Sequence, residues 1–403
     1  MMYVCYMKTL DLFNFENKKV LIRVDFNVPL NKNYLIKDNS RIMAAIPSIE
    51  KILSENGAVI LMSHMGRPKN GVEEKFSLKH LIGEISNALN RPVKFASNCI
   101  DEEAKKIAKN LKNGEVLLLE NLRFYSEEKN GDPNFAHQLA SMGDIFVNEA
   151  FGTAHRAHAS TSVIAKNFKK NKCFGYLMYN EISMLEKILH RGKHPVTAII
   201  GGAKVSSKIT IIKKLIEKVD KIIIGGGMSY TFIKALKGRI GNSIVEEDKI
   251  NLALNLISEA KHKNVEFLLP VDSINAATFS NEAKTYSSNI ENIKDGWIGL
   301  DIGEKTKQIY REAILDSETI FWNGPMGVFE MNKFANGTIF IAKAVAEATS
   351  NGSFSLVGGG DSVAAIKKFN MLNQFTYIST GGGAMLEYIE GKTLPGIKAI
   401  NDD

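Results

Sequence analysis

The sequence alternates short, almost purely apolar runs with longer amphipathic stretches, and this alternation constrains the fold more than any other feature. A run such as Val116–Leu119 is apolar at every position, which is typical of strands buried on both faces of a parallel sheet. The stretches between the runs carry apolar residues three or four positions apart, which indicates helices. We therefore predict an α/β fold. The predicted strands are Lys19–Phe26, Ala58–Ser63, Val116–Leu119, Asp144–Val147, Val196–Ile200, Lys221–Ile224, Val265–Leu269, Thr319–Trp322, Ser355–Val357 and Phe375–Ile378, and the clearest predicted helices are Arg41–Glu55, Ser77–Leu89, Ser206–Lys218 and Asp248–Lys261.

The chain is predicted to divide near its middle. Its 403 residues exceed the roughly 100–200 residues of a typical domain, so two or three domains are expected. Segment Tyr176–Arg191 predicts one helix, because Ile182, Leu185 and Ile188 recur at helical spacing. Four predicted strands precede this helix and six follow it. We therefore predict two doubly wound lobes with parallel sheets, at residues 1–175 and 192–380, joined by a helix at residues 176–191.

Composition excludes several other classes. Cys5, Cys99 and Cys173 are far apart in the sequence, which favours a reducing compartment and no zinc site. The formal net charge is +7, but the lysines are dispersed, so a solvated surface is favoured over a nucleic-acid interface. No apolar run reaches the roughly 20 residues of a spanning helix, and the N-terminus lacks a signal-peptide cleavage pattern. We expect a cytoplasmic protein.

The residues that follow the strands differ between the two halves. Ligands of open parallel sheets bind outside the carboxyl ends of the strands. In the first half these ends are rich in arginine and histidine, and in the second half they are rich in glycine. The first group comprises His64, Arg67, Arg123, His155 and Arg156, with Arg41 nearby, and the second comprises Gly201-Gly202, Gly225-Gly226-Gly227, Gly324, Gly358-Gly359-Gly360 and Gly381-Gly382-Gly383.

These two sets predict two anion sites of different chemistry. Arginine forks match carboxylate and phosphate oxygens, so the first half suits a small, highly anionic molecule. Glycines allow the backbone to approach a phosphate closely, so the second half suits a nucleotide. The sequence has neither a P-loop motif nor a G-x-G-x-x-G motif after a strand. Two alternatives remain at this point: an NAD-dependent dehydrogenase, which lacks its fingerprint, and a basic nucleic-acid-binding protein, which lacks interleaved exposed aromatics.

Three cations occupy positions where the helix dipole disfavours them. Lys204 and Lys208 are predicted on one face at the start of a helix. Arg41 follows Ser40, a predicted N-cap, and so falls in the first turn of its helix. Each such placement costs roughly 0.3–1 kcal/mol. We interpret all three residues as partners of bound anions.

The strand-end strings occur in a fixed order, which begins with Leu21-Ile22-Arg23-Val24-Asp25-Phe26-Asn27-Val28-Pro29 and ends with Glu390-Gly391-Lys392-Thr393-Leu394-Pro395-Gly396. Taken in this order, they resemble the phosphoglycerate kinase family over nearly the whole chain. The resemblance implies two Rossmann-like lobes with a hinge, and a C-terminal segment, residues 381–403, that returns to the N-terminal lobe. It implies the reaction 1,3-bisphosphoglycerate + ADP ⇌ 3-phosphoglycerate + ATP, with Mg²⁺ as cofactor, small-molecule partners, no nucleic acid, no membrane, and a monomer that closes about its hinge for in-line transfer.

The resemblance also assigns site residues. It implies that Arg41 and Lys208 are catalytic, that Asp361 holds the metal, and that Glu330 takes the ribose hydroxyls. The 3-phosphoglycerate site would comprise Asp25, Asn27, Arg41, His64, Arg67, Arg123, His155 and Arg156. The nucleotide site would comprise Gly201, Lys204, Lys208, Gly226, Gly227, Gly299, Leu300, Asn323, Val328, Glu330, Gly358, Gly359, Gly360, Asp361 and Ser362, with Gly381, Gly382 and Gly383 as a phosphate loop.

Three departures from the family pattern leave these assignments in place. Ser362 stands where the family often has threonine, and Glu304 replaces a common proline. Residues Met1–Tyr6 extend beyond the usual start, since Met7-Lys8-Thr9-Leu10 resembles a family N-terminus. We expect this extension to be dispensable.

Overall fold

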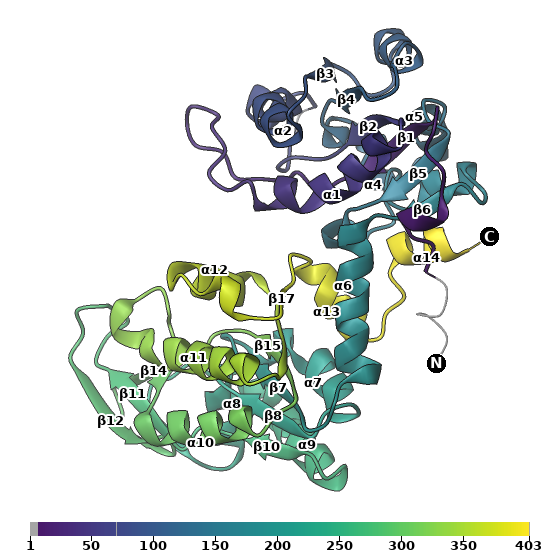
Figure 1. Ribbon diagram of the computed structural model, residues 1–403. Coiled ribbons are helices and arrows are strands. Elements are labelled where there is room, and N and C mark those ends of the chain that lie inside the picture. The colour runs from purple at the N-terminus through teal and green to yellow at the C-terminus, as the bar shows by residue number, and fades with distance from the viewer. Residues whose placement is uncertain (1–6, 70, 403) are drawn as a thin grey trace. The chain divides into compact units, whose positions relative to one another are not determined.

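Two parallel six-stranded sheets, one in each half of the chain, organise the fold (Figure 1). The computed structural model describes residues 7–69 and 71–402, so the expected extension Met1–Tyr6 lies outside the described residues. The chain forms two compact units, residues 1–183 with 393–403 and residues 184–392. The α/β class with parallel sheets, predicted from the apolar runs, is confirmed.

Unit 1 is built on a sheet with the order β3-β4-β2-β1-β5-β6. From β1 the strands run outward in both directions, which is the doubly wound topology, and the order reverses between β1 and β5. Alternate residues of the strands, such as Val59 and Leu61, pack with Ile42 and Ile49 in one core cluster. Each fully buried side chain of this kind contributes about 1.5–3 kcal/mol. The elements are β1 (Lys19–Arg23), α1 (Ser40–Ser54), β2 (Ala58–Met62), α2 (Ile82–Leu89), β3 (Val93–Ala96), α3 (Glu102–Lys109), β4 (Val116–Leu119), α4 (Ser126–Asn130), α5 (Pro133–Ala140), β5 (Ile145–Asn148), β6 (Lys172–Phe174) and α14 (Pro395–Asn401).

Unit 2 repeats this plan with the order β10-β8-β7-β15-β16-β17, reversing between β7 and β15. Its core includes Trp322 and Tyr310, and the Tyr310 hydroxyl donates to the carbonyl oxygen of Ile224 at 2.6 Å. A three-stranded antiparallel sheet, β12-β11-β14, is added to this unit. The elements are β7 (Val196–Ile200), α7 (Ile209–Ile216), β8 (Lys221–Ile224), α8 (Ser229–Ala235), β9 (Arg239–Ile240), α9 (Ile250–His262), β10 (Glu266–Leu268), β11 (Asp272–Ala276), β12 (Thr285–Asn289), β13 (Asn292–Ile293), β14 (Ile298–Ile302), α10 (Glu304–Leu315), β15 (Thr319–Asn323), α11 (Asn336–Ser350), β16 (Phe354–Val357), α12 (Gly360–Lys368), β17 (Tyr377–Ile378) and α13 (Gly383–Ile389).

The segment expected to form one helix at 176–191 changes its winding part-way. It forms α6 (Tyr176–Glu186) and continues as a π-helix at Lys187–Arg191. The division between the two units falls inside α6, between Ser183 and Met184. Residues 381–392 belong to unit 2, and residues 393–403 belong to unit 1. There the Gly396 amide donates to the carbonyl oxygen of Ala154 at 2.8 Å.

Several strands have no counterpart in the prediction. Strand β3 contains the exposed Lys94 between buried and half-buried residues, and β6 has only three residues, so neither gives a continuous apolar run. Strands β11 and β12 have the sequences DSINA and TYSSN, whose polar residues are typical of loops. The pairing of β11 with β12 and β14 therefore depends on tertiary contacts that a local pattern does not encode. Within the part of the chain that the structure describes, no helix is long and apolar enough to cross a membrane.

Candidate active site

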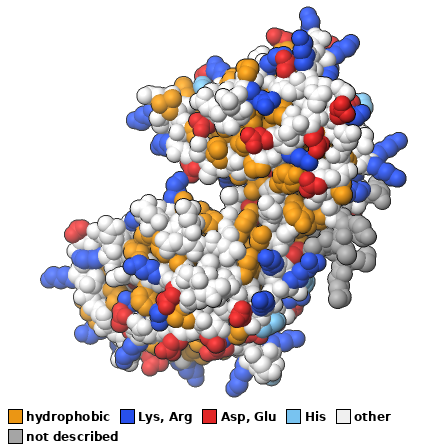
Figure 2. Space-filling view, in the orientation of Figure 1, with side chains coloured by type: hydrophobic (Ala, Val, Ile, Leu, Met, Phe, Trp, Pro, Cys, Tyr) orange, Lys and Arg blue, Asp and Glu red, His pale blue; other side chains and the backbone are white. Residues whose placement is uncertain are grey.

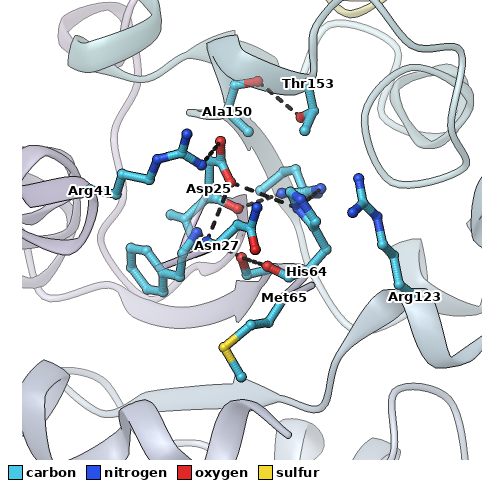
Figure 3. Close-up of polar contacts among 12 residues, drawn as sticks. Asp25, Asn27, Arg41, His64, Met65, Arg123, Ala150 and Thr153 are labelled. Carbon is cyan, nitrogen blue, oxygen red and sulfur yellow. Dashed lines mark hydrogen bonds and ion pairs between the residues drawn. The ribbon is translucent and has the colours of Figure 1, made fainter. Parts of the chain in front are cut away.

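The arginine and histidine residues of unit 1 lie where its strand order reverses. Strand β1 is paired with β2 on one side and β5 on the other, so the segments that follow these three strands emerge at one edge of the sheet. Asp25 and Asn27 follow β1, His64 follows β2, and His155 follows β5. Arg123, in the turn after β4, lies beside this group (Figure 3).

Asp25 and Asn27 organise the cluster. An oxygen of the Asp25 carboxylate accepts from Arg41 Nη1 at 2.8 Å, and the half-buried Arg41 guanidinium is thereby turned toward the strand ends (Figure 3). Arg41 lies in the first turn of α1, as predicted, but it is the second residue of the helix, because the N-cap is Asn39 and not Ser40. The Ser40 amide instead donates to the Asp38 side chain at 3.0 Å, so the chain enters the helix one residue earlier than expected. Asn27 Oδ1 accepts from the Gly66 amide at 2.8 Å and so ties the first two strand ends together.

His64 is buried at the centre of the cluster. Its Nδ1 lies 3.2 Å from Arg23 Nη2 and 3.8 Å from Asp25 Oδ1. Burial lowers the pKa of His64 well below its ordinary value, and the positive charges of Arg23, Arg123, Arg41 and Arg156 lower it further. The ring is therefore neutral at physiological pH.

Arg123 and Arg156 add positive charge around His64. Arg123 Nη1 donates to the carbonyl oxygen of Gly66 at 2.6 Å, and burial together with the neighbouring charge of Arg156 lowers the pKa of Arg123 to about 10. Arg156 Nε lies 3.2 Å from His155 Nε2. Arg67, in contrast, is exposed on the loop after β2. Arg23 and three other arginines therefore act electrostatically on one buried histidine, and such a concentration of positive charge attracts anions.

Glu149 is a buried carboxylate that sequence reasoning overlooked. It follows β5 and accepts hydrogen bonds from the Leu177 amide at 3.0 Å, from the Met178 amide at 3.1 Å and from the Ser48 hydroxyl. It therefore caps the N-terminus of α6 and also contacts α1. Burial raises the pKa of Glu149 to about 7, although these three hydrogen bonds lower it.

The raised pKa of Glu149 predicts a pH dependence of stability. An acid whose folded-state pKa exceeds its unfolded value contributes stability that is fully present below the unfolded pKa, near 4.5, and that is lost as the pH rises through about 7. The free energy of unfolding of the parent protein should thus fall more steeply between pH 5 and 8 than that of Glu149→Gln. Denaturant melts across this pH range measure the difference. Identical slopes in parent and variant would contradict the assignment, and Glu127→Gln, an exposed change on α4, is the control.

Unit 2 has a cavity of about 670 Å³ at the point where its strand order reverses. Five of its lining residues are glycines, and apolar side chains form another part of its wall. Seven residues of the predicted nucleotide set line it, and they are Gly226, Gly227, Gly299, Leu300, Val328, Glu330 and Asp361. The wall, which sequence reasoning missed, includes Tyr230, Ile244, Phe279, Pro325 and Met331.

One observable signal could have indicated this wall. Phe279 is an aromatic residue in a polar loop between β11 and β12, and 62% of it is exposed. The aromatic residue in this polar loop is visible in the sequence, whereas its exposure beside the cavity is known only from the structure. The other wall residues lie in helices and loops far apart in the sequence, and no local pattern groups them.

Backbone contacts close the base of the cavity. The Gly201 amide donates to the carbonyl oxygen of Asn323 at 2.9 Å, and the Gly202 amide donates to that of Pro325 at 3.2 Å. A Cβ atom on Gly201 would lie only 2.1 Å from the Pro325 oxygen. Only glycine therefore allows the segments that follow β7 and β15 to approach this closely.

Lys208 is half-buried next to this region. Its Nζ donates to Asn323 Oδ1, and Asn323 Nδ2 in turn donates to the carbonyl oxygen of Gly358 at 2.8 Å. Burial lowers the pKa of Lys208, while the charges of Asp361 and Glu390 raise it. Lys208 is thus a partly desolvated cation among predicted nucleotide residues.

The expectation that Lys204 and Lys208 share one face of a continuous helix is wrong. A 3₁₀ turn, Val205–Ser207, separates them, and α7 begins only at Ile209. Lys204 and Lys208 are the two residues that flank this turn, and both have non-helical backbone angles. Short polar residues at Ser206 and Ser207 favour such a turn, because their side chains bond nearby groups: Ser206 bonds Glu246, and Ser207 bonds the Lys204 carbonyl.

The remaining predicted residues lie outside the cavity lining. Ser362 Oγ accepts from the Gly324 amide at 2.6 Å, which attaches α12 to the end of β15. Gly359 has a φ of +93° and immediately precedes α12. The three-glycine string leads into α13, which begins at Gly383. The other predicted residues thus lie beside the strand ends or helix starts of unit 2 and not in the cavity wall. They are Gly201, Lys204, Lys208, Asn323, Gly358, Gly359, Gly360, Ser362, Gly381, Gly382 and Gly383.

An enzyme that moves a phosphoryl group between a small anion and a nucleotide needs a site for each of them. The arginine and histidine cluster of unit 1 and the glycine-lined cavity of unit 2 have the composition that such sites require. The fold and the two sites define the class of two-lobed α/β phosphotransferases. The family model described as "Phosphoglycerate kinase" matches residues 10–392.

Named relatives and solved structures agree with this match. A phosphoglycerate kinase of Porphyromonas gingivalis is 50% identical, covering 97% of this chain and 99% of the relative, and one of Chlorobium phaeobacteroides is 50% identical, covering 98% and 99%. The structure of phosphoglycerate kinase from Coxiella burnetii has a TM-score of 0.90 at 39% identity and covers 98% of this chain and 99% of its own. The chain therefore belongs to the phosphoglycerate kinase family. It is a kinase that catalyses the phosphoryl transfer of glycolysis between a nucleotide and a carboxyl group.

Proposed function

We propose that 3-phosphoglycerate binds to the arginine and histidine cluster of unit 1 and that ADP or ATP binds in the cavity of unit 2. The observation that carries this proposal is the gathering of four arginines around the buried His64. Asp25 and Glu128 offset part of this positive charge, and an anionic ligand would offset more of it. The glycine-lined cavity, with its apolar wall, suits a nucleoside and its phosphates. Glu330, exposed at the cavity, would accept hydrogen bonds from the ribose hydroxyls.

The proposed reaction is an in-line transfer. The bond between phosphorus and the acyl oxygen of 1,3-bisphosphoglycerate breaks, and a bond forms between that phosphorus and a terminal oxygen of ADP. Such transfers need alignment and neutralisation of charge more than covalent participation by the protein. Arg41 and Lys208 would supply positive charge to the moving group. Closure of the protein about its hinge helix, which would exclude water from the acyl phosphate, also remains a proposal.

Mg²⁺ fits the residues of unit 2. Mg²⁺ is held in phosphotransferases by one or two carboxylates together with substrate phosphates and water, and Asp361 offers one exposed carboxylate at the cavity. Among the residues that the structure describes, no group of three or more His, Cys, Asp or Glu side chains could hold an ion without the nucleotide. When bound, the ion would neutralise charge on the nucleotide phosphates. We further propose that the protein is cytoplasmic and monomeric. Sedimentation at working concentration would test the monomeric state.

A coupled assay with 3-phosphoglycerate, ATP and Mg²⁺ tests the proposed function, and we expect production of ADP that depends on all three. Absence of turnover with both substrates at saturation would contradict it. Replacing the substrates by NAD and a hydroxy acid tests the dehydrogenase alternative. Figure 2 shows Lys and Arg side chains scattered among acidic ones over the visible surface, which gives no support to a nucleic-acid interface.

Paired substitutions test the assignment of one ligand to each unit. Arg67→Ala should weaken 3-phosphoglycerate and spare nucleotide affinity, because Arg67 lies on the loop after β2 in unit 1. Glu330→Ala should do the reverse. Loss of one charge-assisted hydrogen bond is worth about 1.5–3 kcal/mol, or about tenfold to a hundredfold in affinity. Calorimetry with each ligand measures both constants, and equal weakening of both ligands by either variant would overturn the two-site assignment.

A further inference from the structure

A chain of buried polar side chains leads to His64, and the roles of its other members are not accounted for by the proposed function. Glu128, Ser160, Arg23 and His64 have exposed fractions of 0, 0, 1 and 3%. They come from α4, the loop after β5, the end of β1 and the segment after β2. Burying two charged groups in this way is costly unless they are paired and hydrogen-bonded.

Hydrogen bonds join the four side chains in one continuous series from Glu128 to His64. Ser160 donates to Glu128 Oε1 from its hydroxyl at 2.6 Å, and to Oε2 from its amide at 2.9 Å. The Ser160 hydroxyl oxygen accepts from Arg23 Nε at 2.8 Å. Arg23 Nη1 donates to the carbonyl oxygen of Val24, and Arg23 Nη2 lies 3.2 Å from His64 Nδ1. The guanidinium is therefore held in one orientation, with an N–H directed at the histidine ring.

This geometry determines where His64 carries its hydrogen. A guanidinium has five donors and no acceptor, so the His64 nitrogen that faces Arg23 must accept. Nδ1 is then unprotonated. In a neutral ring the hydrogen must lie on the other nitrogen, Nε2.

The charges around His64 exclude a doubly protonated ring. Arg23, Arg41, Arg123 and Arg156 act on it, and Asp25 Oδ1, at 3.8 Å, is the acidic group of the cluster. A further positive charge would be buried among four others, which costs several kcal/mol per ion in such surroundings. Both arguments point to the same protonation state.

We propose that Glu128, Ser160 and Arg23 are positioning residues that hold His64 as the neutral Nε2–H tautomer, so that it presents a donor to an anionic substrate at every physiological pH. Glu128 supplies the counter-charge that keeps Arg23 in place, and Arg23 excludes the opposite tautomer. The value of this arrangement for substrate binding rests on the proposed function, which places 3-phosphoglycerate beside His64. An unassisted histidine, with a pKa near 6.5, would change its charge in the middle of the physiological range.

The test is nitrogen-15 NMR of the full chain with labelled histidine. In the ligand-free parent between pH 6 and 8, we expect His64 to show a protonated Nε2, an unprotonated Nδ1 and no titration. A protonated Nδ1, or a doubly protonated ring at pH 7, would overturn the proposal. Arg23→Met should convert the neutral His64 ring into a mixture of the two tautomers, because the donor that faces Nδ1 is lost, and retention of the pure Nε2–H tautomer would also overturn the proposal.

Two further variants keep the test decisive. Ser160→Ala removes the link between Arg23 and Glu128 without a change of charge, and it should raise the fraction of the Nδ1–H tautomer even if Arg23→Met fails to fold. Arg91→Met removes an arginine of unit 1 that bonds only backbone carbonyls, and it should leave the His64 signals unchanged.

Binding separates this proposal from the proposed function. For Arg23→Met, the dissociation constant of 3-phosphoglycerate should rise by about tenfold or more, and an unchanged constant would count against the value of the tautomer for binding. If 3-phosphoglycerate leaves the His64 signals of the parent unmoved, the substrate assignment fails, whereas the tautomer in the free protein is measured independently.

Discussion

Lys208→Ala should lower kcat by about 10²- to 10³-fold while the nucleotide dissociation constant changes by less than about tenfold. Removing a preorganised donor that stabilises charge developing in the transition state typically lowers kcat by this factor. The loss appears in kcat more than in the binding constant, because the interaction is made only in the transition state. Lys208 has the required features. It is half-buried, its amino group is held by Asn323, and Asn323 is itself held by the carbonyl oxygen of Gly358.

The environment of Lys208 argues against a surface role. Burial lowers the pKa of Lys208, whereas the charges of Asp361 and Glu390 raise it. The Lys208 side chain therefore interacts with two acidic residues of unit 2 and is partly removed from solvent. Lys213→Ala, an exposed position on α7, the helix that follows Lys208, is the matched control and should retain full kcat. Lys204→Ala, at an exposed position, should mainly weaken nucleotide binding. Steady-state kinetics beside calorimetry separates these outcomes, and a near-normal kcat for Lys208→Ala would remove this residue from the mechanism.

The fold was predictable because its strands are continuous apolar runs. Val116–Leu119 and Lys221–Ile224 were located to the residue, since strands buried on both faces leave no polar interruption. Strand β12 was missed because its polar residues alternate between half-buried and exposed positions. The α7 start was misplaced by three residues, because helical periodicity does not reveal the 3₁₀ turn that precedes it.

The candidate site was predictable only where a residue type has a single plausible use. Arginines and glycines at strand ends predicted an anion site and a nucleotide site, and both assignments stay predictions. Arg23 was overlooked as a site residue although it interrupts an apolar run, which was an available signal. Glu128, Glu149 and Asp301 could not be found in this way. Each is a carboxylate whose burial, with a raised pKa, arises from segments distant in sequence.

Gly201→Ala should destabilise unit 2 and weaken nucleotide binding together. A Cβ atom at this position would lie 2.1 Å from the Pro325 oxygen and 2.6 Å from the Gly324 oxygen, and both are backbone atoms that no side-chain rotation can move aside. The segments after β7 and β15 would have to separate, and the hydrogen bond from the Gly201 amide to the Asn323 carbonyl would be strained. Backbone shifts of this kind cost about 1–3 kcal/mol or more.

The expected result is a fall in the melting temperature of about 2–4 °C for each kcal/mol lost, with a rise in the nucleotide dissociation constant and no change for 3-phosphoglycerate. The nucleotide effect follows because Gly202 and Pro325, which line the cavity, would be displaced. Gly360→Ala is the matched control: no atom lies within 4 Å of its added Cβ, so its melting temperature should not fall. Calorimetric melts and ligand titrations of the three proteins decide the matter. An unchanged Gly201→Ala protein would mean that the backbone at the reversal point yields without cost, and close approach of the two strand ends would then no longer account for glycine at this position.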